Sequence, residues 1–280
     1  MIELVSMRSK GSLEELKRLA DKVRMHVIDM TCEAGSGHPG GSLSAAELFV
    51  ALYFCVMRHD PKNPDWDGRD KFVLSKGHVA PGLYATLAKA GYFPVEELFT
   101  LRKIGSRLQG HPVRGKLPGV EMSTGSLGQG LSMSCGLALA AKLDRKDTRV
   151  FCLLGDGELQ SGQNWEAMML ASHLKLNNLM VFVDRNRLQV MGETEKTVSI
   201  HPLADKLRAF GFKVISVDGH DIKKIAAACN KTSSSPVAVI LRTVKGKGVS
   251  FMENNADFHG RCCTTYERER AICELRERIR

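Results

Sequence analysis

Apolar residues near the amino terminus recur at the three- and four-residue spacing of an amphipathic helix. The stripe consists of Leu13, Leu16, Ala20, Val23, Val27 and Met30. Ser12 and Glu15 have the spacing of a capping box at its start, and Gly35 follows its end. We therefore expect one long helix from about residue 12 to Gly35.

A second pair with capping-box spacing, Ser44 and Glu47, opens another apolar stretch. It predicts a helix that begins at Ser44 and ends before the proline-containing segment 59–64.

From about residue 266, closely spaced acidic and basic residues indicate a charged helix on the surface.

Five short, almost wholly apolar runs lie between these helices. They are Phe72–Leu74, Val150–Leu154, Leu179–Val183, Lys213–Val217 and Pro236–Leu241. Each run is too short for a helix, and each is separated from the next by enough chain for a crossover helix. Continuous apolarity indicates burial on both faces, which is typical of parallel strands. The pattern predicts an α/β fold, doubly wound, with a mostly parallel sheet and helices on both faces.

Length and composition are those of a soluble globular protein. The 280 residues are 43% hydrophobic and 25% charged, and we expect them to form one domain, residues 1–280. No apolar run reaches the roughly 18 residues of a membrane span, and the amino terminus lacks an apolar stretch of secretory type. The eight cysteines include no C-x-x-C pair, which fits a reducing compartment. We therefore expect a cytoplasmic protein that does not bind membranes.

The formal net charge of +9 is compatible with an anionic ligand or with RNA. However, lysine and arginine are spread along the chain, and no basic stripe interleaved with aromatic residues is present. We expect no nucleic-acid binding, and a bias toward ligands that carry phosphate.

Polar, glycine-rich loops follow the predicted strands, at 75–78, 155–157, 184–186 and 245–248. In open α/β sheets ligands bind at the carboxyl ends of the strands. Asp156 and Asn186 lie one βα unit apart, so both can reach one crevice there, and their oxygens suit Mg²⁺ or Ca²⁺ bridging to phosphate. Gly155 and Gly157 would let the backbone approach a diphosphate closely. Taken alone, Gly-Asp-Gly is more often an ordinary turn.

Together with further motifs, these loops resemble the amino-terminal half of the transketolase family. GDG followed one βα unit later by VDRNRLQVMG resembles the thiamine-diphosphate motif. The family's other signatures follow in its order, as GSGHPG (35–40), LSKGH (74–78), GHP (110–112), TGSLGQG (124–130) and FHG (258–260). The resemblance extends from about residue 13 to about residue 275.

The resemblance implies a role for each matching residue. The divalent metal, Mg²⁺ with Ca²⁺ or Mn²⁺ as alternatives, would be held by Asp156, Asn186 and the main-chain oxygen of Leu188. Gly155, Gly157, His78 and His259 would contact the diphosphate of thiamine diphosphate, and Gly125, Ser126 and Leu127 its aminopyrimidine. His38, His111 and His259 would face the sugar and transfer protons.

One residue departs from the family pattern. Ser161 occupies the position of a glutamate that, in the family, joins a carboxylate network between the two active sites of the dimer. Glu158 or Glu166 could take its place, so the departure concerns the coupling of the sites and not cofactor binding.

The resemblance also implies a second chain. In the family, a following domain supplies the glutamate that protonates the cofactor's pyrimidine, and no such domain is identifiable here. We expect a separate carboxy-terminal transketolase subunit with the pyrimidine-binding and carboxy-terminal domains, in a heterotetramer. The pair would transfer a two-carbon ketol unit from a ketose to an aldose, either of them phosphorylated or not. A truncated chain is the alternative.

Parts of the sequence also suggest other functions. GSGHPG fits the dinucleotide motif G-x-G-x-x-G, but it follows a helix, whereas that motif must follow a strand. Within the enzyme class, a subunit similar to 1-deoxyxylulose-5-phosphate synthase is the nearest alternative. A partner subunit that binds the cofactor but has lost catalysis is the non-enzymatic one.

Overall fold

The computed structural model describes residues 11–279. Its centre is a five-stranded parallel sheet in the order β1-β2-β3-β7-β6. The strands are β1 (Lys71–Leu74), β2 (Val150–Gly155), β3 (Leu179–Arg185), β6 (Lys213–Asp218) and β7 (Val237–Arg242). All five predicted runs are strands, and the predicted α/β fold is confirmed. A small antiparallel pair, β4 (Leu188–Gln189) and β5 (Gly192–Glu193), follows β3.

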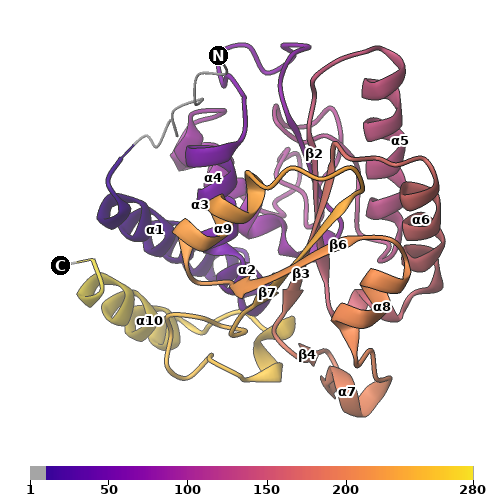
Figure 1. Cartoon of the computed structure of the whole chain (residues 1–280). Helices are drawn as coiled ribbons and strands as arrows, with labels where there is room; N and C mark the ends of the chain where they lie inside the picture. The colour runs from indigo at the N-terminus through magenta and orange to yellow at the C-terminus, as the bar shows by residue number, and fades with distance from the viewer. Residues whose placement is uncertain (1–10, 280) are drawn as a thin grey trace.

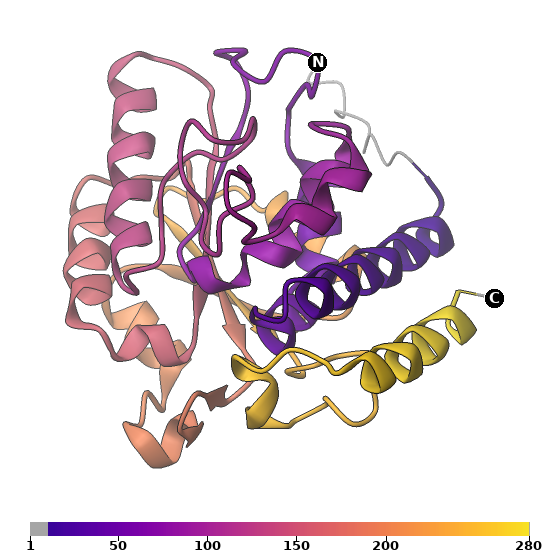
Figure 2. The ribbon, with the colours of Figure 1, turned by 180° about the vertical axis from the view of Figure 1, so that it is seen from behind.

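Helices cover both faces of the sheet (Figure 1). One face carries α1 (Leu13–Glu33), α2 (Pro39–Ser44), α3 (Ala46–Ala51), α4 (Ala80–Ala90), α9 (Ile222–Cys229) and α10 (Thr265–Glu277). The other carries α5 (Gln129–Leu143), α6 (Gly162–His173) and α8 (Leu203–Ala209), with α7 (Thr194–Thr197) beyond them. Figure 2 shows that α1 and α10, from opposite ends of the chain, lie side by side.

Short helical segments complete the connections. A π-helix spans Leu52–Val56, and 3-10 segments span Gly77–Val79, Val95–Thr100, Gly157–Gln160 and Ala256–His259. Among the described residues, no helix is both long enough and apolar enough to cross a bilayer. The predicted lack of a secretory segment concerns the extreme amino terminus, and residues 1–10 lie outside the described range.

Strand β2 shows why continuous apolar runs form this sheet. Phe151 and Leu153 pack into the cluster beneath α1 and α4, while Val150, Cys152 and Leu154 pack into the cluster beneath α5 and α6. Side chains alternate between the two faces of a strand, so a strand that is buried on both sides needs an apolar residue at every position.

The first helix begins as predicted, and the second does not. Ser12 caps α1 with the reciprocal bonds of a capping box to Glu15. The predicted capping box at Ser44 and Glu47 is wrong, because Ser44 is the last residue of α2 and both side chains are engaged elsewhere. The Ser44 hydroxyl donates to Asp184 Oδ2 at 2.6 Å, and Glu47 forms a buried ion pair with Arg24.

Candidate active site

A pocket of about 260 Å³ lies at the carboxyl ends of β1, β2, β3 and β7. Eight of the predicted site residues line it, namely His78, Leu127, Gly155, Asp156, Gly157, Asn186, Leu188 and His259. Parallel strands present their carboxyl ends at the same edge of a sheet, which explains why loops distant in sequence meet here. In register, Gly155 of β2 pairs with Asp184 of β3, so the two loops start side by side.

The predicted metal ligands are three oxygens on one side of this pocket. The Asp156 and Asn186 side chains are buried, with residue exposures of 2% and 7%. Asn186 Oδ1 accepts from the Leu188 amide at 3.0 Å, which fixes the direction of the amide oxygen. The Leu188 carbonyl accepts from the Lys245 ammonium at 3.3 Å, so it already faces a cation. A carboxylate, an amide oxygen and a carbonyl are the ligands that Mg²⁺ and Ca²⁺ prefer, and the residues fit such an ion.

The two oxygens of Asp156 have different partners. Oδ2 accepts from Arg185 Nη1 at 2.9 Å and from the Arg187 amide at 2.6 Å. Within residues 11–279, Oδ1 accepts only from the Gly157 amide, at 2.8 Å, which leaves it lone pairs for a metal. Burial and then the charge of Asp184 raise the pKa of the Asp156 carboxyl, against the hydrogen bond from Arg185. Such a carboxylate gains by binding a cation.

Two buried lysines form the cationic side of the pocket, and sequence reasoning assigned neither to the site. Lys76 bonds Asp184 at 2.5 Å, and Lys245 lies 2.9 Å from His259 Nδ1. Burial and then the charge of Lys76 lower the pKa of Lys245 to about 8. Two ammonium groups beside the metal ligands suit a ligand with several negative charges, such as a diphosphate. The only sequence signal was the position of both lysines in strand-end loops.

Gln189 was also missed. Its side-chain oxygen is buried with no hydrogen-bond partner in the described part of the chain. A Cβ at Gly157 would lie 2.9 Å from that oxygen, so a larger residue there would displace the end of the Gln189 side chain. Buried polar atoms are normally paired, and a hydrogen-bond donor, such as water or the N–H of a ligand, would satisfy this oxygen.

The four predicted histidines form one cluster. The ring of His38 lies 5.2 Å from that of His78, 5.6 Å from that of His259 and 6.3 Å from that of His111. His78 and His259 stack at 5.1 Å. His38 and His111 thus lie next to the pocket rather than in its wall. His38 Nδ1 is buried and has no partner within residues 11–279.

All four imidazoles are held neutral. Burial, followed by the charge of Arg102, lowers the pKa of His38 to about 4 and also lowers that of His111. Burial and the charge of Lys245 lower the pKa of His259 to about 3, and burial lowers that of His78 well below its usual value. A neutral imidazole donates a hydrogen bond from one ring nitrogen and can accept a hydrogen bond or a proton at the other, which suits contacts to hydroxyl groups.

The loop that contains Gly125, Ser126 and Leu127 passes against this cluster. A Cβ at Gly125 would lie 3.2 Å from the His111 ring, and the backbone φ there is +151°. Gly125 and Ser126 lie outside the pocket wall, whereas Leu127 lines it and is 41% exposed. The structure therefore brings this loop to the site, with one residue in direct contact with the pocket.

The two acids that could replace a glutamate at Ser161 have different environments. Glu158 is buried and accepts from the Ser75 hydroxyl at 2.5 Å and from the amides of Gly128 and Gly155. Glu166 is exposed on α6. The Glu158 carboxylate is therefore occupied by hydrogen bonds from its own chain, whereas Glu166 is the acid that a second chain could reach.

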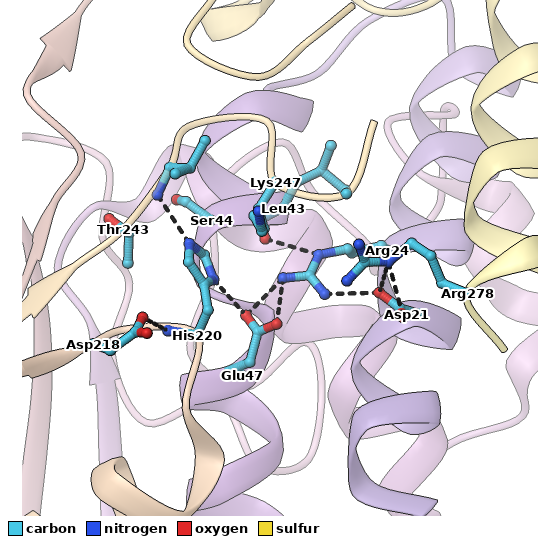
Figure 3. A network of polar contacts seen from close by, with 12 residues as sticks. Asp21, Arg24, Leu43, Ser44, Glu47, Asp218, His220, Thr243, Lys247 and Arg278 are labelled. Carbon is cyan, nitrogen blue, oxygen red and sulfur yellow. Dashed lines mark hydrogen bonds and ion pairs between the residues drawn. The ribbon is translucent and has the colours of Figure 1, made fainter. Parts of the chain in front are cut away.

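A buried polar network supports the loop that contains Lys245 (Figure 3). His220 Nε2 accepts from the Val244 amide at 2.9 Å, so its Nδ1 must donate to Glu47 Oε2, 3.0 Å away. Arg24 Nη2 donates to both oxygens of the Glu47 carboxylate, at 2.7 and 2.6 Å. The network thus fixes the Val244 amide, and with it the start of the Lys245 loop, to α1 and α3.

We expect Glu47→Ala to lower the free energy of unfolding by about 3–5 kcal/mol, because it takes from the buried Arg24 guanidinium one of its two acids, leaving Asp21, and takes from His220 the acceptor of its Nδ1. Burial would raise the pKa of Glu47, but Arg24 and His220 lower it to about 2. The stabilisation is therefore present above the unfolded-state pKa of about 4.3 and is lost as the pH falls toward 2. Urea unfolding measures the change.

The matched control is Glu193→Ala, which removes an exposed acid paired with Lys196. Its effect should stay within about 1 kcal/mol. Equal effects of the two variants would show that the network contributes no special stability.

Known proteins resemble this chain over nearly its whole length. The family described as "Transketolase, thiamine diphosphate binding domain" matches residues 15–276. The 6-deoxy-6-sulfo-D-fructose transketolase subunit SqwG of Clostridium sp. (strain MSTE9) is 42% identical, over 93% of this chain and 96% of its own length. An apulose-4-phosphate transketolase subunit of Phocaeicola vulgatus is 41% identical, over 95% of this chain and 96% of its own length.

Longer transketolases match over part of their length. The human transketolase is 43% identical over 95% of this chain, which spans 43% of the human protein. The crystal structure of transketolase from Campylobacter jejuni superposes with a TM-score of 0.89 at 32% identity, over 95% of this chain and 43% of that one. The chain therefore belongs to the transketolase family, and it contains that family's thiamine diphosphate binding domain.

Proposed function

We propose that this chain is the cofactor-binding subunit of a two-chain transketolase, which transfers a two-carbon ketol unit from a ketose to an aldose. The observation that carries the proposal is the meeting of three kinds of group around one pocket. Oxygen ligands for a divalent metal, two buried lysines and a cluster of neutral histidines line it or adjoin it. This combination suits a magnesium-bound diphosphate with a polyhydroxylated substrate beside it.

In this proposal Asp156, Asn186 and Leu188 hold Mg²⁺, with Ca²⁺ or Mn²⁺ as substitutes. Lys245 and His78 lie in the pocket wall, where they can bind phosphate oxygens by charge and by hydrogen bonding. Thiamine diphosphate supplies the carbon nucleophile and electron sink of the reaction when it is bound.

The histidines beside the pocket would handle the sugar. His38, His111 and His259 are neutral and close together, so they can hydrogen-bond the hydroxyls of a ketose and move protons among them. Substrates are accordingly sugars or sugar phosphates.

A partner subunit is proposed from two observations. The Clostridium and Phocaeicola relatives, which this chain covers almost entirely, are both described as transketolase subunits. Leu127, Val190 and Met191, at or next to the pocket wall, are exposed by 41%, 64% and 82%. Apolar surface around an active site is typical of a protein interface. We propose a carboxy-terminal transketolase subunit there, in a cytoplasmic heterotetramer of two chains of each kind.

Calorimetric titration of the isolated chain with thiamine diphosphate tests the cofactor assignment. We expect saturable binding with Mg²⁺ present and much weaker binding with a chelator, since the metal offsets the charge of the diphosphate. Fluorescence titration with NADH is the control, and it should show no saturation. Binding of NADH, or equal binding of thiamine diphosphate with and without metal, would contradict the proposal.

The histidines should separate into two kinetic classes once the partner is present. His78→Ala should mainly weaken cofactor affinity, because the imidazole faces the phosphate side of the pocket beside Lys76 and Lys245. His111→Ala should mainly lower turnover or raise the donor KM, because its proposed partner is a substrate hydroxyl. Steady-state kinetics at several cofactor concentrations distinguish the two. A pure cofactor defect in both variants would show that the substrate-facing role of His111 is wrong.

A further inference from the structure

A second pocket, of about 470 Å³, lies away from the proposed active site. Lys71, the first residue of β1, lines it, whereas the active-site loops follow the last residues of the strands. Because the strands are parallel, the two pockets lie toward opposite ends of the strands. None of the residues that line the active-site pocket lines this one.

Its walls are strongly cationic. They include five basic side chains, Arg69, Lys71, Arg107, Arg114 and Lys116. The acids in the wall are Asp65 and Glu121, which leaves an excess of three positive charges (five minus two).

Among the described residues, two of these five basic side chains are paired with acids, and three are not. Arg69 forms a bidentate pair with Glu121, and Arg107 pairs with Glu97 at 2.5 and 2.8 Å. Within residues 11–279 the side chains of Lys71, Arg114 and Lys116 make no hydrogen bond or ion pair. Glu97, which lies outside the wall, neutralises Arg107, and Glu121 neutralises Arg69. The three remaining cations, Lys71, Arg114 and Lys116, outnumber the remaining wall acid, Asp65, and such an excess on a concave surface attracts anions.

The wall that contains Arg114 and Lys116 is fixed in place. The two ends of the loop 112–124 are hydrogen-bonded to each other, because the Thr124 amide donates to the Pro112 carbonyl at 3.1 Å. Leu117 and Val120, within that segment, are buried in the core with exposures of 4% and 8%. The backbone that presents the two free cations is therefore anchored, which lowers the entropy cost of binding a ligand.

We propose that this pocket binds a small molecule through a tetrahedral oxyanion, a phosphate or a sulfonate, at a site separate from the thiamine diphosphate site. The planar fork of Arg114, which has no acid partner within residues 11–279, suits bidentate contact with such a group, and Lys71 and Lys116 add point charges. The inference stands on this pocket alone and does not depend on the proposed function.

The test follows the backbone amides of the full chain by NMR during titration with sodium phosphate. Thiamine diphosphate and Mg²⁺ are present throughout, so that phosphate does not report on the active site. Sodium methanesulfonate forms a second arm, and sodium chloride at equal ionic strength is the reference. We expect saturable shifts over residues 114–122 with phosphate, with methanesulfonate or with both, and none with chloride. A response to phosphate alone assigns a phosphorylated ligand.

Two double variants sharpen the result. Arg114→Ala with Lys116→Ala should weaken phosphate binding about tenfold or more, because two charge-assisted contacts are lost. Lys223→Ala with Lys231→Ala removes the same charge from exposed positions in and after α9, and should leave the affinity within about twofold. Both remove exposed side chains, so both should fold.

Three outcomes would overturn the inference. Shifts that chloride reproduces would indicate general screening. Equal losses in the two double variants would indicate a diffuse charge effect. Absence of any saturable shift, together with failure of the Arg114→Ala and Lys116→Ala variant to assemble with the partner subunit, would assign the pocket to a protein interface instead.

Discussion

Asp156→Ala is expected to weaken thiamine diphosphate binding by more than about a hundredfold in the presence of Mg²⁺. Asp156 is the only charged group among the three proposed metal ligands, and Asn186 and Leu188 offer neutral oxygens only. Without the carboxylate a divalent ion would be poorly held, and the diphosphate would lose its bridging cation. Calorimetry on the isolated chain measures the effect without any need for catalysis.

The variant also removes an acceptor from Arg185 and from the Arg187 amide, so a control for folding is needed. Glu195→Ala is a matched control, because Glu195 is the other carboxylate that pairs with Arg185 and it does not line the pocket. It should leave cofactor affinity within about threefold, since the metal ligands are intact. A folded Asp156→Ala protein with unchanged affinity would show that the metal assignment is wrong.

The sheet and the meeting of Asp156 and Asn186 at one pocket could be predicted because both follow from local sequence and a general rule. Continuous apolar runs such as the one at Val150–Leu154 identify buried parallel strands without knowledge of the contacts. The rule that ligands bind at the carboxyl ends of strands then places Asp156 and Asn186 together. The structure brings these two side chains to one pocket wall.

The features that were missed depend on contacts between distant parts of the chain. Ser44 and Glu47 have the spacing of a capping box, but Ser44 bonds Asp184, 140 positions away, and Glu47 pairs with Arg24, 23 positions away. These long-range bonds outweigh the local capping preference, and no pattern within one segment reports them. Lys245 was overlooked for the same reason, since a lysine in a loop is normally exposed and this one is buried.

The isolated chain is expected to lack transketolase activity, and a second chain should restore it. The proposed metal ligands and phosphate contacts are all present here, so the chain should bind the cofactor alone. Catalysis also needs an acid opposite the pyrimidine ring, which the family resemblance places on another domain. The pocket is open beside Leu127 and Val190, where a partner would exclude water and complete the site.

Loss of the partner should reduce turnover by several orders of magnitude, because activation of the cofactor is a chemical step and not only a matter of affinity. Cofactor affinity itself should change far less. Comparison of cofactor binding with turnover therefore separates a chain that cannot bind the cofactor from one that binds it but cannot activate it.

The most direct test of the account is a coupled ketol-transfer assay, with thiamine diphosphate and Mg²⁺, on three samples: this chain, the candidate carboxy-terminal subunit, and an equimolar mixture. We predict no ketol transfer from either chain alone and saturable transfer from the mixture. Full activity from this chain alone would contradict the two-chain account, and inactivity of a mixture in which the chains assemble would indicate a subunit that binds the cofactor without catalysis.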